Sequence, residues 1–115
     1  MHDSDAMPIN SETRDGAVIL SPVGDVDMAH SPSLRSALRS AQEGKPPRLV
    51  VNLTDVRYMD SSGLATLVES MRSAKNARTS MVLCGMNPKV KAIFEIARLD
   101  QFFTVVDDLD QALTV

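Results

Sequence analysis

The sequence has few aromatic residues, with three phenylalanines, one tyrosine and no tryptophan, so its core must be built from aliphatic side chains. It has one cysteine, Cys84, which excludes a disulfide within the chain and makes a reducing cytoplasm the expected location. Twelve Lys and Arg against fifteen Asp and Glu give a net charge of −3. That balance excludes the basic footprint of a nucleic-acid-binding protein and a polybasic membrane patch.

Long apolar runs are also lacking, because no stretch approaches the roughly 20 residues that cross a bilayer. We therefore expect no membrane insertion. The 115 residues, 43% apolar and 23% charged, match one ordinary globular domain and argue against disorder. The polar, acidic start predicts a flexible N-terminal tail over residues 1–7 rather than a signal peptide, followed by one domain over residues 8–115. A ragged first strand over residues 7–13 is the alternative to a longer tail.

Strand-like and helix-like segments alternate along the chain, as judged from short apolar runs and from apolar spacings of i, i+3, i+4 and i+7. Strands are predicted at residues 17–23, 48–53, 80–84 and 103–106, with a loop at 24–27. Helices are predicted after caps at Ser31, at Asp60 or Ser61 and at Asn87, and at residues 107–113. This order is typical of an α/β fold with a mixed, mostly parallel sheet of four to five strands and about four helices packed on it.

No constellation of residues predicts an active site. His2 and His30 lie far apart in the sequence, and no Cys/His pair has the spacing of metal ligands. Cys84 lies within an apolar strand, where a buried, unreactive thiol is a better interpretation than a nucleophile. Glycine-rich phosphate-binding motifs do not occur. We therefore expect a protein that is not an enzyme and has no metal or cofactor.

Residues 58–64 form a segment that is polar where its neighbours are apolar. Capping of the helix that follows explains one polar side chain, from Asp60 or Ser61. It leaves a second serine, Ser62, and a glycine, Gly63, that costs up to about 1 kcal/mol of helix propensity. The local fold alone does not favour that glycine. The favoured interpretation is a small, accessible helix start that suits close approach by another macromolecule or a phosphoryl group.

Residues 59–64, Met-Asp-Ser-Ser-Gly-Leu, resemble the signature of STAS domains, and in particular of anti-sigma factor antagonists. Further segments that resemble the family lie in order at residues 24–27, 50–56, 84–90 and 94–103, so the likeness spans about residues 8–113. Asn52 and Arg98 depart from it, since the family commonly has an aspartate and a glycine at these positions. The resemblance implies a single STAS-type domain.

The resemblance also implies a phosphorylation switch. Ser62 would be the phosphoacceptor, Asp60 and Ser61 would shape its site, and the loop with Asp27 would help contact a kinase. The residues expected to bind that partner are Asp25, Asp27, Asp60, Ser61, Ser62 and Gly63. In such families the partner is an anti-sigma factor that is also a serine kinase. Phosphorylation of the antagonist abolishes binding, and a serine phosphatase restores it.

ATP and magnesium belong to the kinase in this scheme, and the chain itself is expected to be a cytoplasmic monomer or weak homodimer. Three other functions stay open on the sequence. They are a non-phosphorylated STAS subunit of a lipid-transport ATPase complex, a signalling scaffold, and a small enzyme with an unrecognised site. The paired serines, Ser61 and Ser62, favour the kinase substrate over the transport subunit.

Overall fold

A computed structural model describes residues 7–115 of the chain. Residues 1–6, which make up most of the predicted tail, lie outside the described residues. Met7 is 7% exposed and packs in the core. The strand β1 (Ile9–Arg14) follows it, so the alternative of a first strand in this region is confirmed, two residues later than expected.

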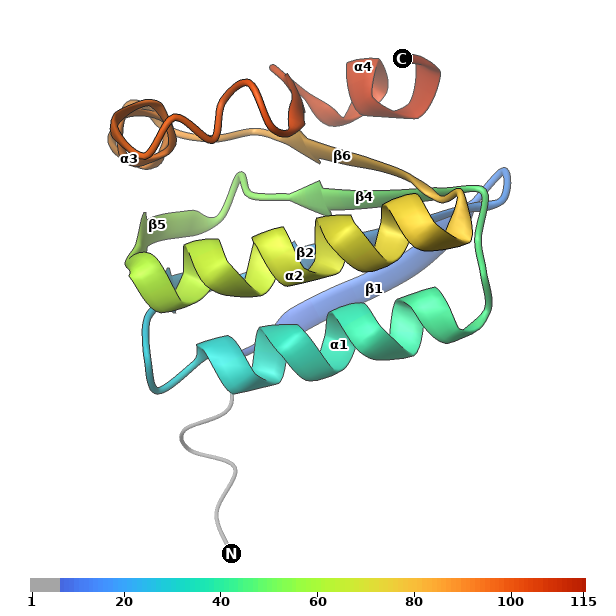
Figure 1. The fold of residues 1–115 in the computed structure, drawn as a ribbon, viewed down its shortest axis with the longest axis horizontal. Coiled ribbons are helices and arrows are strands. Elements are labelled where there is room, and N and C mark those ends of the chain that lie inside the picture. The colour runs from blue at the N-terminus through green and yellow to red at the C-terminus, as the bar shows by residue number, and fades with distance from the viewer. Residues whose placement is uncertain (1–6) are drawn as a thin grey trace, which may run out of the picture.

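The main sheet has five strands in the order β1-β2-β4-β6-β7. β1 is antiparallel to β2, and the other neighbouring strands are parallel, which confirms the mixed, mostly parallel sheet. Its remaining strands are β2 (Ala17–Pro22), β4 (Arg48–Asn52), β6 (Ser80–Cys84) and β7 (Thr104–Val106). Four helices alternate with the strands of the described chain: α1 (Ser31–Glu43), α2 (Ser61–Ala77), α3 (Pro88–Ile96) and α4 (Leu109–Thr114) (Figure 1).

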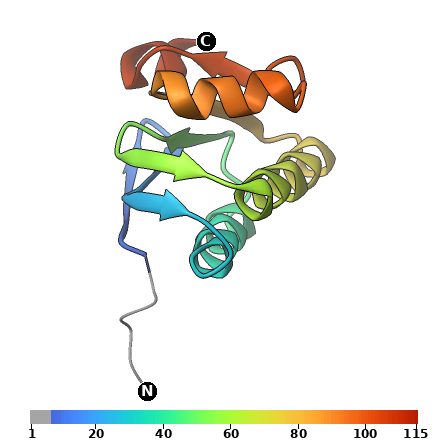
Figure 2. The same cartoon turned by 90° about the vertical axis from the view of Figure 1, so that its left-hand side faces the viewer.

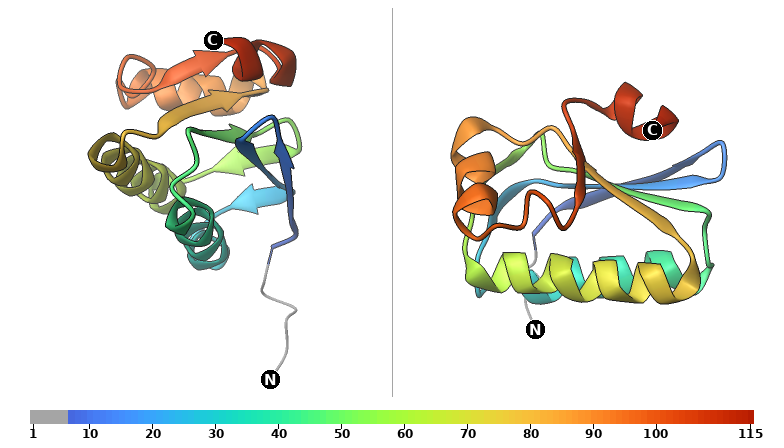
Figure 3. Two further views of the ribbon diagram at one scale, coloured as in Figure 1. Left: turned by 90° about the vertical axis from the view of Figure 1, so that its right-hand side faces the viewer. Right: turned by 45° about the horizontal axis from the view of Figure 1, so that its top comes forward.

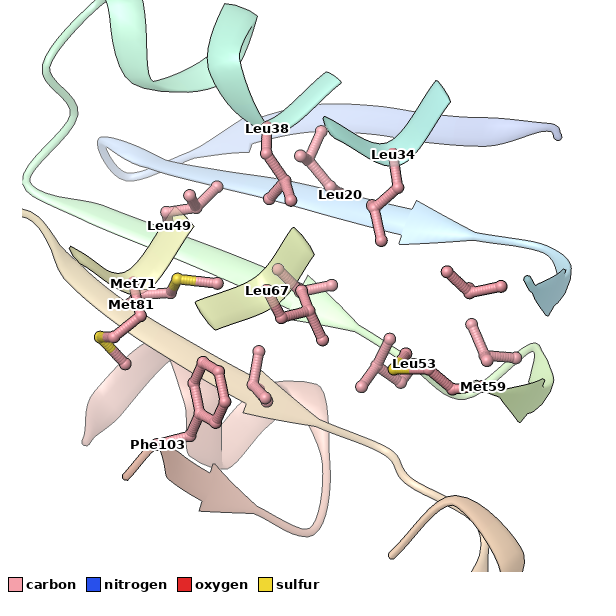
Figure 4. Packing of buried hydrophobic residues seen from close by; sticks show 14 of the residues in the cluster. Leu20, Leu34, Leu38, Leu49, Leu53, Met59, Leu67, Met71, Met81 and Phe103 are labelled. Atoms are coloured by element: carbon pink, nitrogen blue, oxygen red, sulfur yellow. The ribbon is translucent and has the colours of Figure 1, made fainter. Parts of the chain in front are cut away.

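The helices cover both faces of the main sheet. α1 and α2 lie side by side on one face and α4 lies on the other (Figures 1 and 3). Because side chains alternate along a strand, β4 serves both layers. Leu49 and Val51 join the larger cluster beneath α1 and α2, whereas Val50 joins the smaller cluster beneath α4. The larger cluster is mostly aliphatic and rich in methionine, as the scarcity of aromatic residues requires (Figure 4).

A second, two-stranded sheet lies at the end of the molecule where α1 and α2 begin (Figure 2). In it, β3 (Gly24–Val26) pairs in parallel with β5 (Val56–Met59). The prediction of a loop is therefore wrong for residues 24–26. Three residues carry too little periodicity to indicate a strand, and the partner that orders them lies far along the chain.

The start of α1 also differs from its prediction. Ser31 is the first helical residue rather than the cap, and it is 5% exposed. The cap is His30, whose side chain makes no capping bond. The turn before the helix is held instead by Asp27, whose Oδ1 accepts bonds from the backbone N–H groups of Ala29 and His30, each at 3.1 Å.

The two departures from the family pattern lie outside the polar segment at residues 58–64. Asn52 Oδ1 accepts bonds from the hydroxyl and the backbone N–H of Thr54, at 2.6 and 3.3 Å, as a carboxylate oxygen would. Arg98 follows α3 with φ +60°, in the left-handed region that favours glycine. A glycine at this position would therefore fit the same turn with less strain.

Candidate functional site

The polar segment lies where β5 ends and α2 begins. Asp60 is the N-cap of α2, and its Oδ1 accepts bonds from the backbone N–H groups of Ser62 and Gly63 at 2.9 and 3.3 Å. The expected cap is confirmed, with Asp60 rather than Ser61 in that position. The same oxygen accepts a bond from Ser62 Oγ at 2.6 Å.

These donors fix the charge of Asp60. The bond from the Ser62 hydroxyl has the largest effect on the pKa of the carboxyl group and lowers it. Burial, the second-largest effect, raises the pKa, and the backbone N–H groups of Gly63, Ser62 and Met28 lower it again, so the net shift is downward. Asp60 is therefore an ionised acceptor at neutral pH. Its contact with Met28 also ties the loop after β3 to the start of α2.

The two serines of the segment have different surroundings. Ser61 is exposed, and no hydrogen bond joins its side chain to another residue within 7–115. Ser62 is half-buried: its hydroxyl is held by Asp60, and its carbonyl accepts a bond from Thr66 Oγ1 at 2.8 Å. Both serines lie at the positive end of the helix dipole, where a negative charge is stabilised by about 0.3–1 kcal/mol.

Gly63 is buried, and packing explains why it is a glycine. A Cβ at this position would lie 2.5 Å from Met59 Cγ, 2.8 Å from Val26 Cγ1 and 3.0 Å from Val26 O. The first turn of α2 therefore packs directly against both strands of the small sheet. Helix propensity alone still does not favour this glycine. The close approach of β3, which was not visible in the sequence, explains it.

The small sheet brings the acidic residues of the loop after β2 to the same end of the molecule. Asp25 pairs with Tyr58 across the two strands, and Asp60 N donates to Val26 O at 3.1 Å. Figure 2 shows β3 and β5 side by side, with α1 and α2 leading away from them. Asp25, Asp27 and Asp60 therefore lie on adjoining segments.

Asp25 and Asp27 are engaged differently. The Asp25 carboxylate lies 3.5 Å from Arg57 Nε in an exposed pair, which contributes little to stability and leaves the carboxylate open to solvent. Asp27 Oδ1 lies 2.9 Å from His30 Nδ1 in addition to its two backbone bonds, so its carboxylate is occupied within its own loop. Asp25 is thus the freer of the two for contact with another molecule.

Sequence reasoning missed one residue of this end of the molecule. Met28, in the loop between β3 and α1, is 78% exposed, although methionine is usually buried. Tyr58, on the neighbouring strand β5, is 43% exposed. A large apolar residue between Asp27 and Ala29 was the available signal, but only the fold shows that its side chain faces solvent.

The residues outside this segment include the single cysteine and the groups that could hold a metal ion. Cys84 is buried, as predicted, and burial together with the charge of Asp108 raises the pKa of its thiol to about 11, which disfavours the reactive thiolate. Between residues 7 and 115, no three His, Cys, Asp or Glu side chains are grouped to hold a metal ion. Over the same residues, no helix combines the length and apolar character needed to cross a membrane.

Comparison with known proteins matches the STAS domain model to residues 8–112. The anti-sigma-B factor antagonist of Listeria monocytogenes is 30% identical over 82 residues, covering 71% of this chain and 72% of that protein. The anti-sigma F factor antagonist of Paenibacillus polymyxa is 26% identical over 94% of this chain and 93% of its own length. The crystal structure of an anti-sigma factor antagonist from Mycobacterium paratuberculosis superposes with a TM-score of 0.88 at 26% identity, covering 99% of this chain and 97% of that one.

Proposed function

The chain belongs to the STAS domain family, and on that premise we propose that it is an anti-sigma factor antagonist in a partner-switching pathway. It binds an anti-sigma factor with serine kinase activity while Ser62 is unphosphorylated and is released once Ser62 carries phosphate. The observation that carries the proposal is the Ser62 hydroxyl held by Asp60 at the start of α2. The antagonists that align with most of the chain support the same function.

The surroundings of Ser62 support a role in docking. Asp25, Met28 and Tyr58 lie on segments next to the start of α2 and are open to solvent. Exposed methionine and tyrosine side chains supply apolar contact area, and the neighbouring carboxylates supply charge. Asp25, Asp27, Asp60, Ser61, Ser62 and Gly63 remain the residues proposed for this interface, with Gly63 acting through the close packing it allows. A partner with basic and apolar side chains would complement this surface.

Electrostatics supports the release step. A phosphoserine adds about −1.5 to −2 charges at pH 7. At Ser62 that charge would stand beside the ionised Asp60 and near the segment that carries Asp25. Like charges brought together in an interface cost several kcal/mol, and every 1.4 kcal/mol is tenfold in affinity. One modification therefore ends binding without unfolding the domain.

Other proteins carry out the phosphorylation and dephosphorylation of Ser62. The kinase supplies ATP and magnesium, a serine phosphatase removes the phosphate, and this chain acts as a regulatory protein rather than an enzyme. It requires no cofactor of its own. We expect it to work in the cytoplasm as a monomer or weak homodimer.

Capture by a variant that cannot be phosphorylated tests the proposal. Ser62→Ala, immobilised and exposed to a lysate of its native cells, is expected to retain a protein that phosphorylates the unmodified chain at Ser62 when ATP is added. Ser62→Asp is the matched control and is expected to retain much less of it. Capture of a membrane transport ATPase instead, with no serine kinase activity, would contradict the proposal and favour the transport subunit.

A further inference from the structure

Two serines, Ser61 and Ser62, are adjacent at the start of α2. Their exposure favours Ser61, which is not the proposed phosphate acceptor. Ser61 is exposed and has no side-chain hydrogen bond to another residue of the described chain. Ser62 is half-buried and already bonded. Accessibility alone would make Ser61 the better acceptor of a phosphoryl group. Phosphorylation of Ser62 rather than Ser61 therefore requires a residue that favours Ser62 more strongly than exposure favours Ser61.

We propose that Asp60 is a positioning residue that selects Ser62 over Ser61 as the phosphate acceptor. The inference rests on the proposed function. Asp60 Oδ1 lies 2.6 Å from Ser62 Oγ, a short charge-assisted hydrogen bond that fixes the hydroxyl proton toward the carboxylate. The lone pairs of that oxygen are then directed away from Asp60, where a phosphoryl donor can approach.

The rest of the local structure holds Asp60 in this position. Its extended backbone and its bonds from the N–H groups of Ser62 and Gly63 place Oδ1 over the first turn of the helix. The backbone of Met28 approaches the same carboxylate from the neighbouring loop. Ser61, although adjacent in sequence, makes no such bond, so its hydroxyl has no fixed orientation and no acceptor for its proton.

Phosphoryl transfer to Ser62 forms one bond and breaks another. Ser62 Oγ forms a bond to the γ-phosphorus of ATP, and the bond from that phosphorus to the bridging oxygen breaks, with its electron pair leaving on ADP. The hydroxyl proton moves along its existing bond toward Asp60 Oδ1 and then to solvent. Because the pKa of Asp60 is lowered, the carboxylate is ionised before the reaction and keeps the proton only briefly. Orientation of the hydroxyl is therefore its main contribution.

The Asp60→Asn variant distinguishes the positioning of the Ser62 hydroxyl from the capping of α2. Asparagine caps helices about as well as aspartate and can still accept the two backbone bonds, but it is a weaker acceptor for the hydroxyl and cannot take its proton. Asp108→Asn is the matched control, because it removes the charge of another capping aspartate, at the start of α4 on the opposite face of the sheet, outside the proposed interface. Asp60→Ser, which also caps well, serves as a second variant should the amide perturb the fold.

Peptide mapping by mass spectrometry of the full chain, expressed in its native cells, tests the inference. The wild-type chain and Asp108→Asn are expected to carry phosphate on Ser62. In Asp60→Asn, phosphate on Ser62 is expected to fall about tenfold or more, and part of it to shift to Ser61. With the captured kinase, the Asp60→Asn change is expected in kcat rather than in KM. A purely structural role would not change the ratio of the two sites at unchanged thermal stability.

Failure of the selection by Asp60 and failure of the proposed function give different results. Wild-type phosphorylation on Ser61, or undiminished phosphorylation of Ser62 in both Asp60 variants, overturns the selection by Asp60 and leaves a kinase substrate. Complete absence of phosphate from the wild-type chain overturns the proposed function, and the inference with it.

Discussion

The starts of α1 and α2 are chemically similar and structurally different. Each helix follows a strand of the small sheet, has an aspartate shortly before it, and has a serine as its first residue. At α1, Asp27 is bound within its own loop and Ser31 is buried. At α2, Asp60 holds the hydroxyl of Ser62. Aspartate and serine at a helix start therefore do not by themselves form a functional site. Whether they form one depends on the accessibility of the serine and on the group that is bonded to the carboxylate.

The largest expected effect is on partner binding, and it distinguishes the start of α2 from the start of α1. Ser62→Asp places a fixed charge beside Asp60 and is expected to lower the affinity for the captured kinase about 100-fold. Ser33→Asp places the same charge in the first turn of α1 and is expected to lower the affinity for the kinase less than about threefold. Titration calorimetry measures both. Equal losses would show that net charge, rather than the position of Ser62, controls binding.

A second comparison uses the first helical residue of each helix. Ser31→Asp buries a carboxylate at a position that is 5% exposed and is expected to lower the free energy of unfolding by at least about 2 kcal/mol. Ser61→Asp adds its charge at an exposed helix start and is expected to change that free energy by less than about 1 kcal/mol. Urea denaturation measures both values. Similar values for the two variants would contradict the contrast in burial.

The third residue of each helix gives a smaller effect. Gly63→Ala puts a methyl group against Met59 and Val26, and the overpacking, partly offset by better helix propensity, is expected to cost about 1–2 kcal/mol. Ser33→Ala, at the equivalent position of α1, is expected to stay within about 0.5 kcal/mol. If thermal unfolding shows Gly63→Ala to be as stable as the wild type, then the packing account of this glycine is wrong.

The smallest expected effect concerns the charge of Asp60. Its pKa is lower in the folded chain than the usual value of about 3.9, so the carboxylate stabilises the fold above that pH and loses this contribution as the pH falls through the folded pKa. The stability difference between the wild type and Asp60→Asn is therefore expected to be constant near neutral pH and to shrink below about pH 4. A difference that stays constant into this acid range would contradict the bonding described for Asp60.

At the end of the molecule that carries the small sheet, local sequence patterns predicted the features that depend on residues adjacent in the chain. The apolar stripe of α2 and the capping residue before it were visible in the sequence because a cap and its helix are adjacent in the chain. The pairing of β3 with β5 was not, since it joins segments separated by the whole of α1. The packing of Gly63 and the exposure of Met28 both depend on that pairing, so neither was predictable.

The start of α1 gives the converse lesson. Ser31 followed by Pro32 fits a capped helix start, yet His30 occupies the cap position and Ser31 is buried. The competing arrangement is a turn held by Asp27, whose oxygen satisfies two backbone N–H groups before the helix begins. Sequence preferences for capping identify the right few residues, and tertiary contacts decide which of them becomes the cap.

Peptide mapping of the chain purified from its native cells is the most direct test of the central claim that Ser62 is the switch. Samples taken during growth and stress, with phosphatases inhibited, are compared by intact mass and then by fragment mass. The account predicts a fraction heavier by one phosphoryl group, located on Ser62. Absence of that phosphate under every condition would contradict it.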